Sequence, residues 1–150
     1  MTSNKIITNR NKILEVVKQD GAALEYASDS LKADREVVLE AVKQDGNALE
    51  YASDSLKADR EVVLEAVKQD GNALEYASDS LKADREVVLE AVKNLGQKLW
   101  HERRYDAFEY ASDSLKADRE VVLEVVKLDG DVLQEVSKEL QNDKDIVMAA

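Results

Sequence analysis

The chain contains no cysteine and no proline among its 150 residues, and tryptophan, histidine and phenylalanine each occur once. Without cysteine, neither a disulfide framework nor a cysteine-ligated metal site can form. Without proline, no residue obliges a helix to stop or kink. A single histidine among repeated charged residues leaves no Ser-His-Asp triad and argues against a transition-metal site. These absences predict a non-enzymatic protein without a cofactor or metal.

Excess basic charge and long apolar runs are also missing. The chain has 21 basic and 32 acidic residues, a formal net charge of −11. Binding to nucleic acid or to an anionic membrane depends on clustered Lys and Arg, so neither partner is expected. No apolar run approaches the roughly 20 residues that span a bilayer, and the first residues contain no apolar signal core. We therefore expect a soluble, cytoplasmic protein whose partner is another protein.

A unit of 25 residues recurs almost unchanged along the chain. Its equivalent positions are Val16, Ala41, Ala66, Ala91 and Val125. Tandem units of this kind form arrays in which each repeat contacts its neighbours. We therefore expect residues 1–150 to form a single array of about five repeats.

Each unit predicts two helices. Asp59 is a good N-cap, and a broad apolar face follows it at helical spacing, formed by Val62, Val63, Ala66 and Val67. We expect Val63 and its equivalents Val38, Val88 and Val122 to lie between layers. Because neither helix buries its apolar face alone, stacking predicts an all-α fold, an α-solenoid of two-helix repeats.

Gly71 is expected to end the first helix by adopting the left-handed conformation. The second helix of the unit is expected to begin after it. Asn72 with Glu75 has the spacing of a capping box. The same spacing recurs as Asn47 with Glu50, Asp106 with Glu109, and Asp131 with Gln134. The segment Ser78–Ser80 favours a turn or a short 3₁₀ piece, so this helix is expected to be short.

The repeated unit G-x-A-L-E-Y-A-S-x-x-L-K-A-D-R-E-V-V-L-E-A-V-K resembles the tandem helical repeats of the family catalogued as domain of unknown function 4116. The resemblance covers Asn9 to Ala150. It implies a helical array and brings no set of catalytic residues. A weaker similarity, in unit length and the D-x-E-V opening, is to leucine-rich variant repeats, which pair an α-helix with a 3₁₀ helix.

One repeat departs from the pattern by an insertion. Ala91 and its counterpart Val125 are 34 residues apart, which places nine extra residues, QKLWHERRY, at 97–105. Either the preceding helix continues through Gly96, or Gly96 ends it and a new turn precedes Asp106. We favour the continuation.

The insertion is basic in an otherwise acidic chain and contains the only Trp and the only His. Its residues suited to a partner contact are Leu99, Trp100, His101, Arg103, Arg104 and Tyr105. A structural interpretation is equally open, in which Trp100 covers the groove between neighbouring repeats. His101 with Glu102 could contribute to a weak metal site.

One tyrosine recurs at the same repeat position: Tyr26, Tyr51, Tyr76 and Tyr110. Stacking would align these rings in a ladder, which could bind an extended partner. Ordinary packing of an amphipathic ring at a buried edge explains them as well.

The function predicted from these features is a scaffold for protein–protein interaction. An accessory helical region of a larger enzyme and a ligand-binding module centred on the insertion are the alternatives. The near-identity of the copies and the incomplete units at both ends suggest an excised or engineered segment. Apolar residues of the terminal units predict end-to-end self-association: Ile13, Leu14 and Val17 at one end, and Ile146, Val147 and Met148 at the other.

Overall fold

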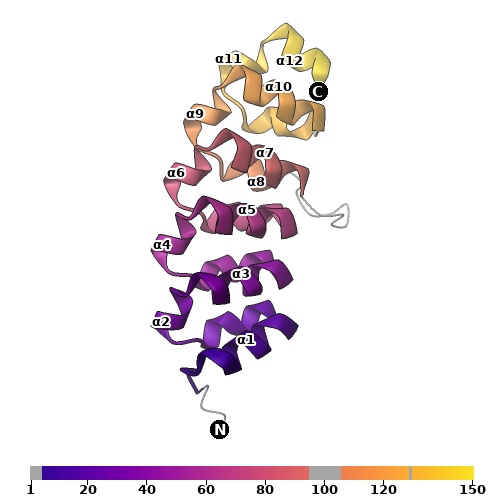
Figure 1. Ribbon diagram of the computed structural model, residues 1–150. Helices are drawn as coiled ribbons and strands as arrows, with labels where there is room; N and C mark the ends of the chain where they lie inside the picture. Colours follow the sequence, from indigo (N-terminus) through magenta and orange to yellow (C-terminus); the bar gives the residue numbers. More distant parts are fainter. Residues whose placement is uncertain (1–4, 95–105, 129) are drawn as a thin grey trace.

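The protein is a stack of helical layers along one axis, with its two termini at opposite ends (Figure 1). This architecture comes from a computed structural model that describes residues 5–94, 106–128 and 130–150. Across these residues the secondary structure is helical, apart from one isolated parallel bridge between Ile7 and Ala27. The predicted all-α solenoid is therefore confirmed.

Each repeat contains a long helix, a 3₁₀ helix and a single-turn α-helix. The long helices are α1 (Arg10–Gln19), α3 (Arg35–Gln44), α5 (Arg60–Gln69), α7 (Arg85–Lys93), α10 (Arg119–Leu128) and α12 (Lys144–Ala149). The 3₁₀ helices are η1 (Gly21–Tyr26), η2 (Gly46–Tyr51), η3 (Gly71–Tyr76) and η4 (Gly130–Glu135). The single turns are α2 (Asp29–Lys32), α4 (Asp54–Lys57), α6 (Asp79–Lys82), α9 (Asp113–Lys116) and α11 (Lys138–Gln141). The repeat with the insertion has an α-helical turn, α8 (Asp106–Glu109), before α9.

The second helix predicted for each unit is therefore two pieces. Ala52 and Ser53 are extended and separate η2 from α4. The Ser53 N–H, which a continuous helix would use internally, donates instead to the Lys32 carbonyl of the preceding repeat at 2.9 Å. The equivalent bonds run from Ser28 to Ile7, Ser78 to Lys57, Ser112 to Lys82 and Ser137 to Lys116. Bonding between layers thus interrupts the helix, and the 3₁₀ piece agrees with the similarity to leucine-rich variant repeats.

The predicted capping boxes at Asn47 and Asn72 are wrong. Asp45 is the N-cap of η2, and its carboxylate accepts from the Asn47 N–H at 3.0 Å. The Asn47 side chain donates to Asp70 of the next repeat at 3.0 Å. Asp70 caps η3 in the same way. The side chains of Asp106 and Asp131 lie outside the described residues.

The repeat glycine is required for close approach, and the predicted left-handed conformation is wrong. No described glycine has a positive φ. A Cβ at Gly46 would lie 2.4 Å from the carbonyl oxygen of Ala66, in the long helix of the next repeat. At Gly21 and Gly71 the corresponding distances are 2.3 and 1.9 Å. Each glycine therefore makes room for the backbone of the following layer.

The apolar face predicted for the long helix forms the core. Val62, Val63, Ala66 and Val67 of α5 are fully buried. The equivalents in α3, α7 and α10 belong to the same continuous cluster of buried residues, which runs along the stack. The Asp59 N-cap is also confirmed, because its carboxylate accepts from the N–H groups of Glu61 and Val62.

Val63→Ala is expected to destabilise the array by about 1 to 3 kcal/mol, because it removes two methyl groups from a packed interior. Lys68→Ala, on the exposed side of the same helix, is expected to cost far less. Urea unfolding of both variants measures the difference. Equal shifts of the two midpoints would contradict the assignment of the buried face.

The continuation of α7 through Gly96 is wrong, since α7 ends at Lys93. Asn94 is its C-cap, and the Asn94 N–H bonds to the Glu90 and Ala91 carbonyls. Beyond the insertion, Ala107 and Phe108 are fully buried. Phe108 therefore takes the place of the repeat leucine Leu74, as the alignment of the two units predicts.

The ends of the array differ from the prediction of exposed apolar residues. Ile13, Val17 and Ile146 are fully buried, and Leu14 packs against the core. Val147 and Met148 are exposed, at 47% and 76%. In α1, Lys12 occupies the position of the buried Val37, so this end has a polar residue where an internal layer has an apolar one. End-to-end association stays a prediction, with Ile6, at 65% exposure, as the exposed large apolar side chain before α1 and Val147 and Met148 in α12.

Candidate interaction surfaces

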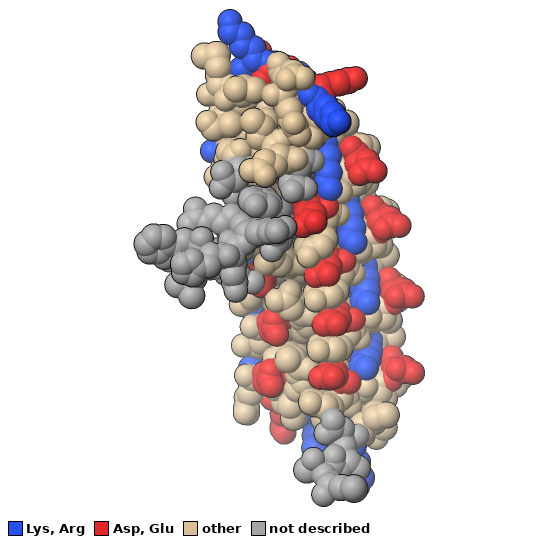
Figure 2. Space-filling view, turned by 180° about the vertical axis from the view of Figure 1, so that it is seen from behind, with Lys and Arg blue, Asp and Glu red and all other residues tan. Residues whose placement is uncertain are grey.

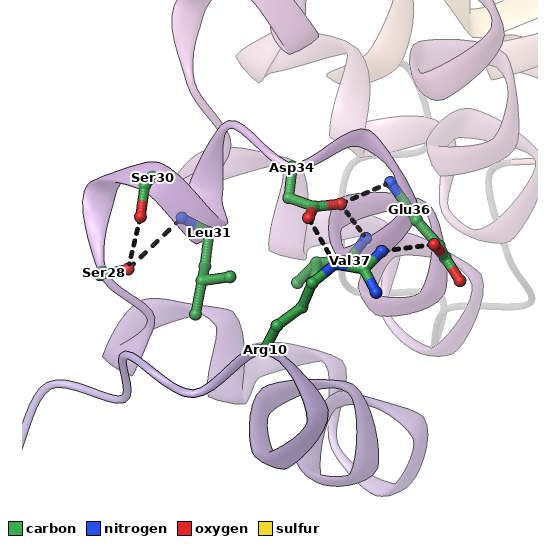
Figure 3. A network of polar contacts seen from close by, with 7 residues as sticks. All are labelled: Arg10, Ser28, Ser30, Leu31, Asp34, Glu36 and Val37. Atoms are coloured by element: carbon green, nitrogen blue, oxygen red, sulfur yellow. Dashed lines mark hydrogen bonds and ion pairs between the residues drawn. The ribbon is translucent and has the colours of Figure 1, made fainter.

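The first surface, the arginine edge, is a series of ion pairs between successive long helices. Arg10 Nε donates to Asp34 Oδ2 at 2.7 Å, and Arg10 Nη2 bonds to Glu36 (Figure 3). The arginine starts one long helix, and the two carboxylates start the next. Arg35, Arg60 and Arg119 make the same pair of contacts with the following repeat.

The aspartate of each pair has two roles. Oδ1 of Asp34 accepts from the N–H groups of Glu36 and Val37, at 3.1 and 3.3 Å, while Oδ2 accepts from Arg10. One carboxylate therefore caps a helix and ties it to the preceding layer (Figure 3). The hydrogen bond from Arg10 is the main cause that holds the pKa of Asp34 below its usual value. Arg60 lowers the pKa of Asp84 in the same way.

The array is expected to lose stability in acid because of these aspartates. A carboxylate with a lowered folded pKa stabilises the fold above its unfolded pKa, about 3.9, and this contribution is lost as pH falls through the folded value. Arg60→Gln should therefore lower the urea midpoint at pH 7. The difference in urea midpoint between this variant and the parent chain should shrink below pH 4. Lys43→Gln, which removes an exposed cation that forms no ion pair with a described residue, is the control. If the difference in urea midpoint between Arg60→Gln and the parent chain were constant from pH 7 to pH 2.5, the pairing of Arg60 with Asp84 would be contradicted.

The ion-pair series changes at the repeat that carries the insertion. Arg85 bonds to Glu120 at 3.0 Å, and the contact with the capping aspartate that the other arginines make is absent among the described contacts of Arg85. An open groove of about 400 Å³ lies along the outer side of α7, lined by Arg60, Asp84, Arg85, Glu86, Leu89, Glu90 and Lys93. The insertion thus coincides with a change in the coupling between layers.

The partner-contact residues predicted in the insertion, Leu99, Trp100, His101, Arg103, Arg104 and Tyr105, lie outside the described residues. Elsewhere in the described chain, no three His, Asp or Glu side chains lie close enough to hold a metal ion.

The second surface, the tyrosine face, follows the ends of the 3₁₀ helices. Tyr26, Tyr51 and Tyr76 are the last residues of η1, η2 and η3. Tyr26 is 39% exposed, while Tyr51, Tyr76 and Tyr110 are half-buried against the core. Tyr51 lies close enough to Tyr26 and to Tyr76 to interact with both electrostatically. Tyr26, Tyr51 and Tyr76 are therefore neighbours in adjacent layers, and the extension of the ladder to Tyr110 stays a prediction.

The charges of neighbouring carboxylates act on the tyrosine hydroxyls. Partial burial is the main cause of the raised pKa of Tyr51, and the negative charges of Glu25 and Glu50 raise it further. Tyr76 has a raised pKa for the same reasons, with partial burial as the main cause and the negative charges of Glu50 and Glu75 next. Both hydroxyls therefore lie in a negative electrostatic potential.

Open grooves recur beside these tyrosines with the same lining in successive repeats. One, of about 310 Å³, is lined by Asp29, Lys32, Tyr51, Ala52, Ser53 and Asp54. The next, of about 270 Å³, is lined by Asp54, Lys57, Tyr76, Ala77, Ser78 and Asp79. Asp54 contributes to both, so the two grooves adjoin. Columns of like charge run along the stack in the same repetitive way (Figure 2).

The protein consists of layers of long and short helices that are joined by recurring ion pairs and backbone hydrogen bonds. This arrangement defines a tandem helical-repeat protein. The chain belongs to the family described as Domain of unknown function (DUF4116), whose model matches residues 9–57, 59–116, 102–141 and 118–150. No curated protein and no solved structure matches the chain. None of the described helices is long and apolar enough to cross a membrane.

Proposed function

We propose that the protein is a non-enzymatic scaffold that binds a protein partner along several repeats at once. The observation that supports this most is the tyrosine face, where adjoining grooves offer the same side chains in successive layers. A surface of this kind suits an extended partner, because each added repeat adds an equivalent contact. An active site, in contrast, needs different groups converging on one point.

The experiment compares three forms of the chain in a quantitative pull-down. They are the parent, a Tyr51→Ala/Tyr76→Ala variant and a variant lacking residues 97–105. The proposal expects a reproducible partner of the parent chain whose capture falls in the tyrosine variant. An equal loss of partner capture from both variants would indicate that the insertion also contacts the partner. The absence of any reproducible partner of the parent chain would overturn the proposal and favour a passive spacer.

A further inference from the structure

We infer that the partner of the tyrosine face is an extended peptide segment with a Lys or Arg at every third residue. This inference rests on the proposed function and specifies its ligand class. The three features that carry it are the repeated grooves, the distribution of charge between the two surfaces, and the spacing of the layers.

The carboxylates of the arginine edge are paired with guanidinium groups, whereas those of the tyrosine face form no ion pair with a described residue. On the arginine edge, Asp59 and Glu61 both pair with Arg35. On the tyrosine face, Glu50, Asp54 and Asp79 are exposed and form no ion pair with any described residue. The open carboxylates recur in each layer, so the face attracts a partner whose positive charges recur as well.

Each groove combines the two groups that recognise a cation. Tyr76 is one of the residues that line the groove, and a cation over an aromatic face is attracted by the quadrupole of the ring. Asp54 and Asp79 line the same groove, and the negative charges of Glu50 and Glu75 act on the Tyr76 hydroxyl. Lys57 also lines the groove, but the carboxylates outnumber it.

The spacing of the layers sets the period of the peptide. Packed helices lie about 8 to 10 Å apart. A peptide in the polyproline II conformation rises about 3.1 Å per residue and has three residues per turn, so one turn spans about 9 Å. Every third side chain of such a peptide therefore reaches the same groove of the next layer. Equivalent grooves beside Tyr51 and Tyr76 would hold side chains three residues apart.

The test uses fluorescein-labelled 15-residue peptides and fluorescence anisotropy. The principal probe has lysine at every third residue, with proline and serine between. Two further peptides have the same composition with the lysines clustered at one end or alternating with serine, and a fourth has glutamate in place of each lysine. We expect the three-residue period to bind most tightly, binding to weaken as salt rises, and the glutamate peptide not to bind.

Variants of the protein identify the surface. Tyr51→Ala/Tyr76→Ala and Glu50→Gln/Glu75→Gln are each expected to weaken binding of the principal probe about tenfold. The matched control is Glu15→Gln/Glu124→Gln, which removes the same charge from exposed positions on the long helices and should change the affinity far less. Circular dichroism of each variant checks that the helical array is retained.

Equal affinity for all lysine peptides, or an unchanged affinity of the folded tyrosine variant, would overturn the inference. Failure of every peptide to bind would overturn it too. If a protein captured in the pull-down still depended on Tyr51 and Tyr76, the scaffold function would stand without this ligand class. If no peptide binds and the pull-down captures no partner that depends on Tyr51 and Tyr76, both the peptide inference and the proposed scaffold function are rejected.

Discussion

Phe108→Ala is expected to destabilise the protein by about 3 to 5 kcal/mol. Phe108 is the largest fully buried side chain of the described residues. It lies in α8, which packs against α7, η3 and η4 and so joins the layers on both sides of the insertion. Because the free energy of unfolding of folded domains is only about 5 to 15 kcal/mol, this single truncation would remove a large part of it. Urea unfolding followed by circular dichroism measures it.

Phe108→Leu is the matched control, since leucine is the residue that the ordinary repeats have at this position, as in Leu49 and Leu74. Both leucines are fully buried. The leucine variant keeps most of the buried volume and should lose far less stability than the alanine variant. A loss below about 1 kcal/mol for Phe108→Ala would contradict a packed core beside the insertion.

Gly46→Ala is expected to cost about 3 kcal/mol, the upper end of the range for overpacking. The new Cβ would lie 2.4 Å from the Ala66 carbonyl oxygen and 3.1 Å from the Asp70 nitrogen. Both atoms are backbone, so the next layer as a whole must shift. The φ angle of Gly46 is not positive, so the cost comes from the contact alone. Thermal unfolding of the variant measures the loss.

Gly130→Ala is the control for this prediction. Its Cβ would approach Ala150, with the nearest atom, the carbonyl carbon, at 2.9 Å. This contact is longer than the 2.4 Å contact at Gly46, so a smaller shift relieves it, and alanine also reduces the conformational entropy of the unfolded chain. A small effect of either sign is therefore expected. Equal losses for Gly46→Ala and Gly130→Ala would show that the repeat glycine has another role.

The tyrosine face could be predicted from the sequence, whereas the sequence analysis did not predict the arginine edge. Repetition alone places Tyr51 and Tyr76 at equivalent points of adjacent layers, whatever the details of packing. The pairing of Arg35 with Asp59 and Glu61 depends on how far one layer is offset from the next. A usable signal was present, because each arginine precedes its two carboxylates by 24 and 26 residues in the ordinary repeats.

Spacing along the chain predicts the repeat, the long helix with its Asp59 cap, and the buried face that includes Val63. These features depend on side-chain spacing and on hydrogen bonds between residues two or three positions apart. The split of the second helix at Ser53 and the need for glycine at Gly46 arise instead from packing between layers. Both depend on contacts with a neighbouring layer about 20 residues away in sequence. A local sequence pattern does not indicate which backbone group of the next layer lies within contact distance.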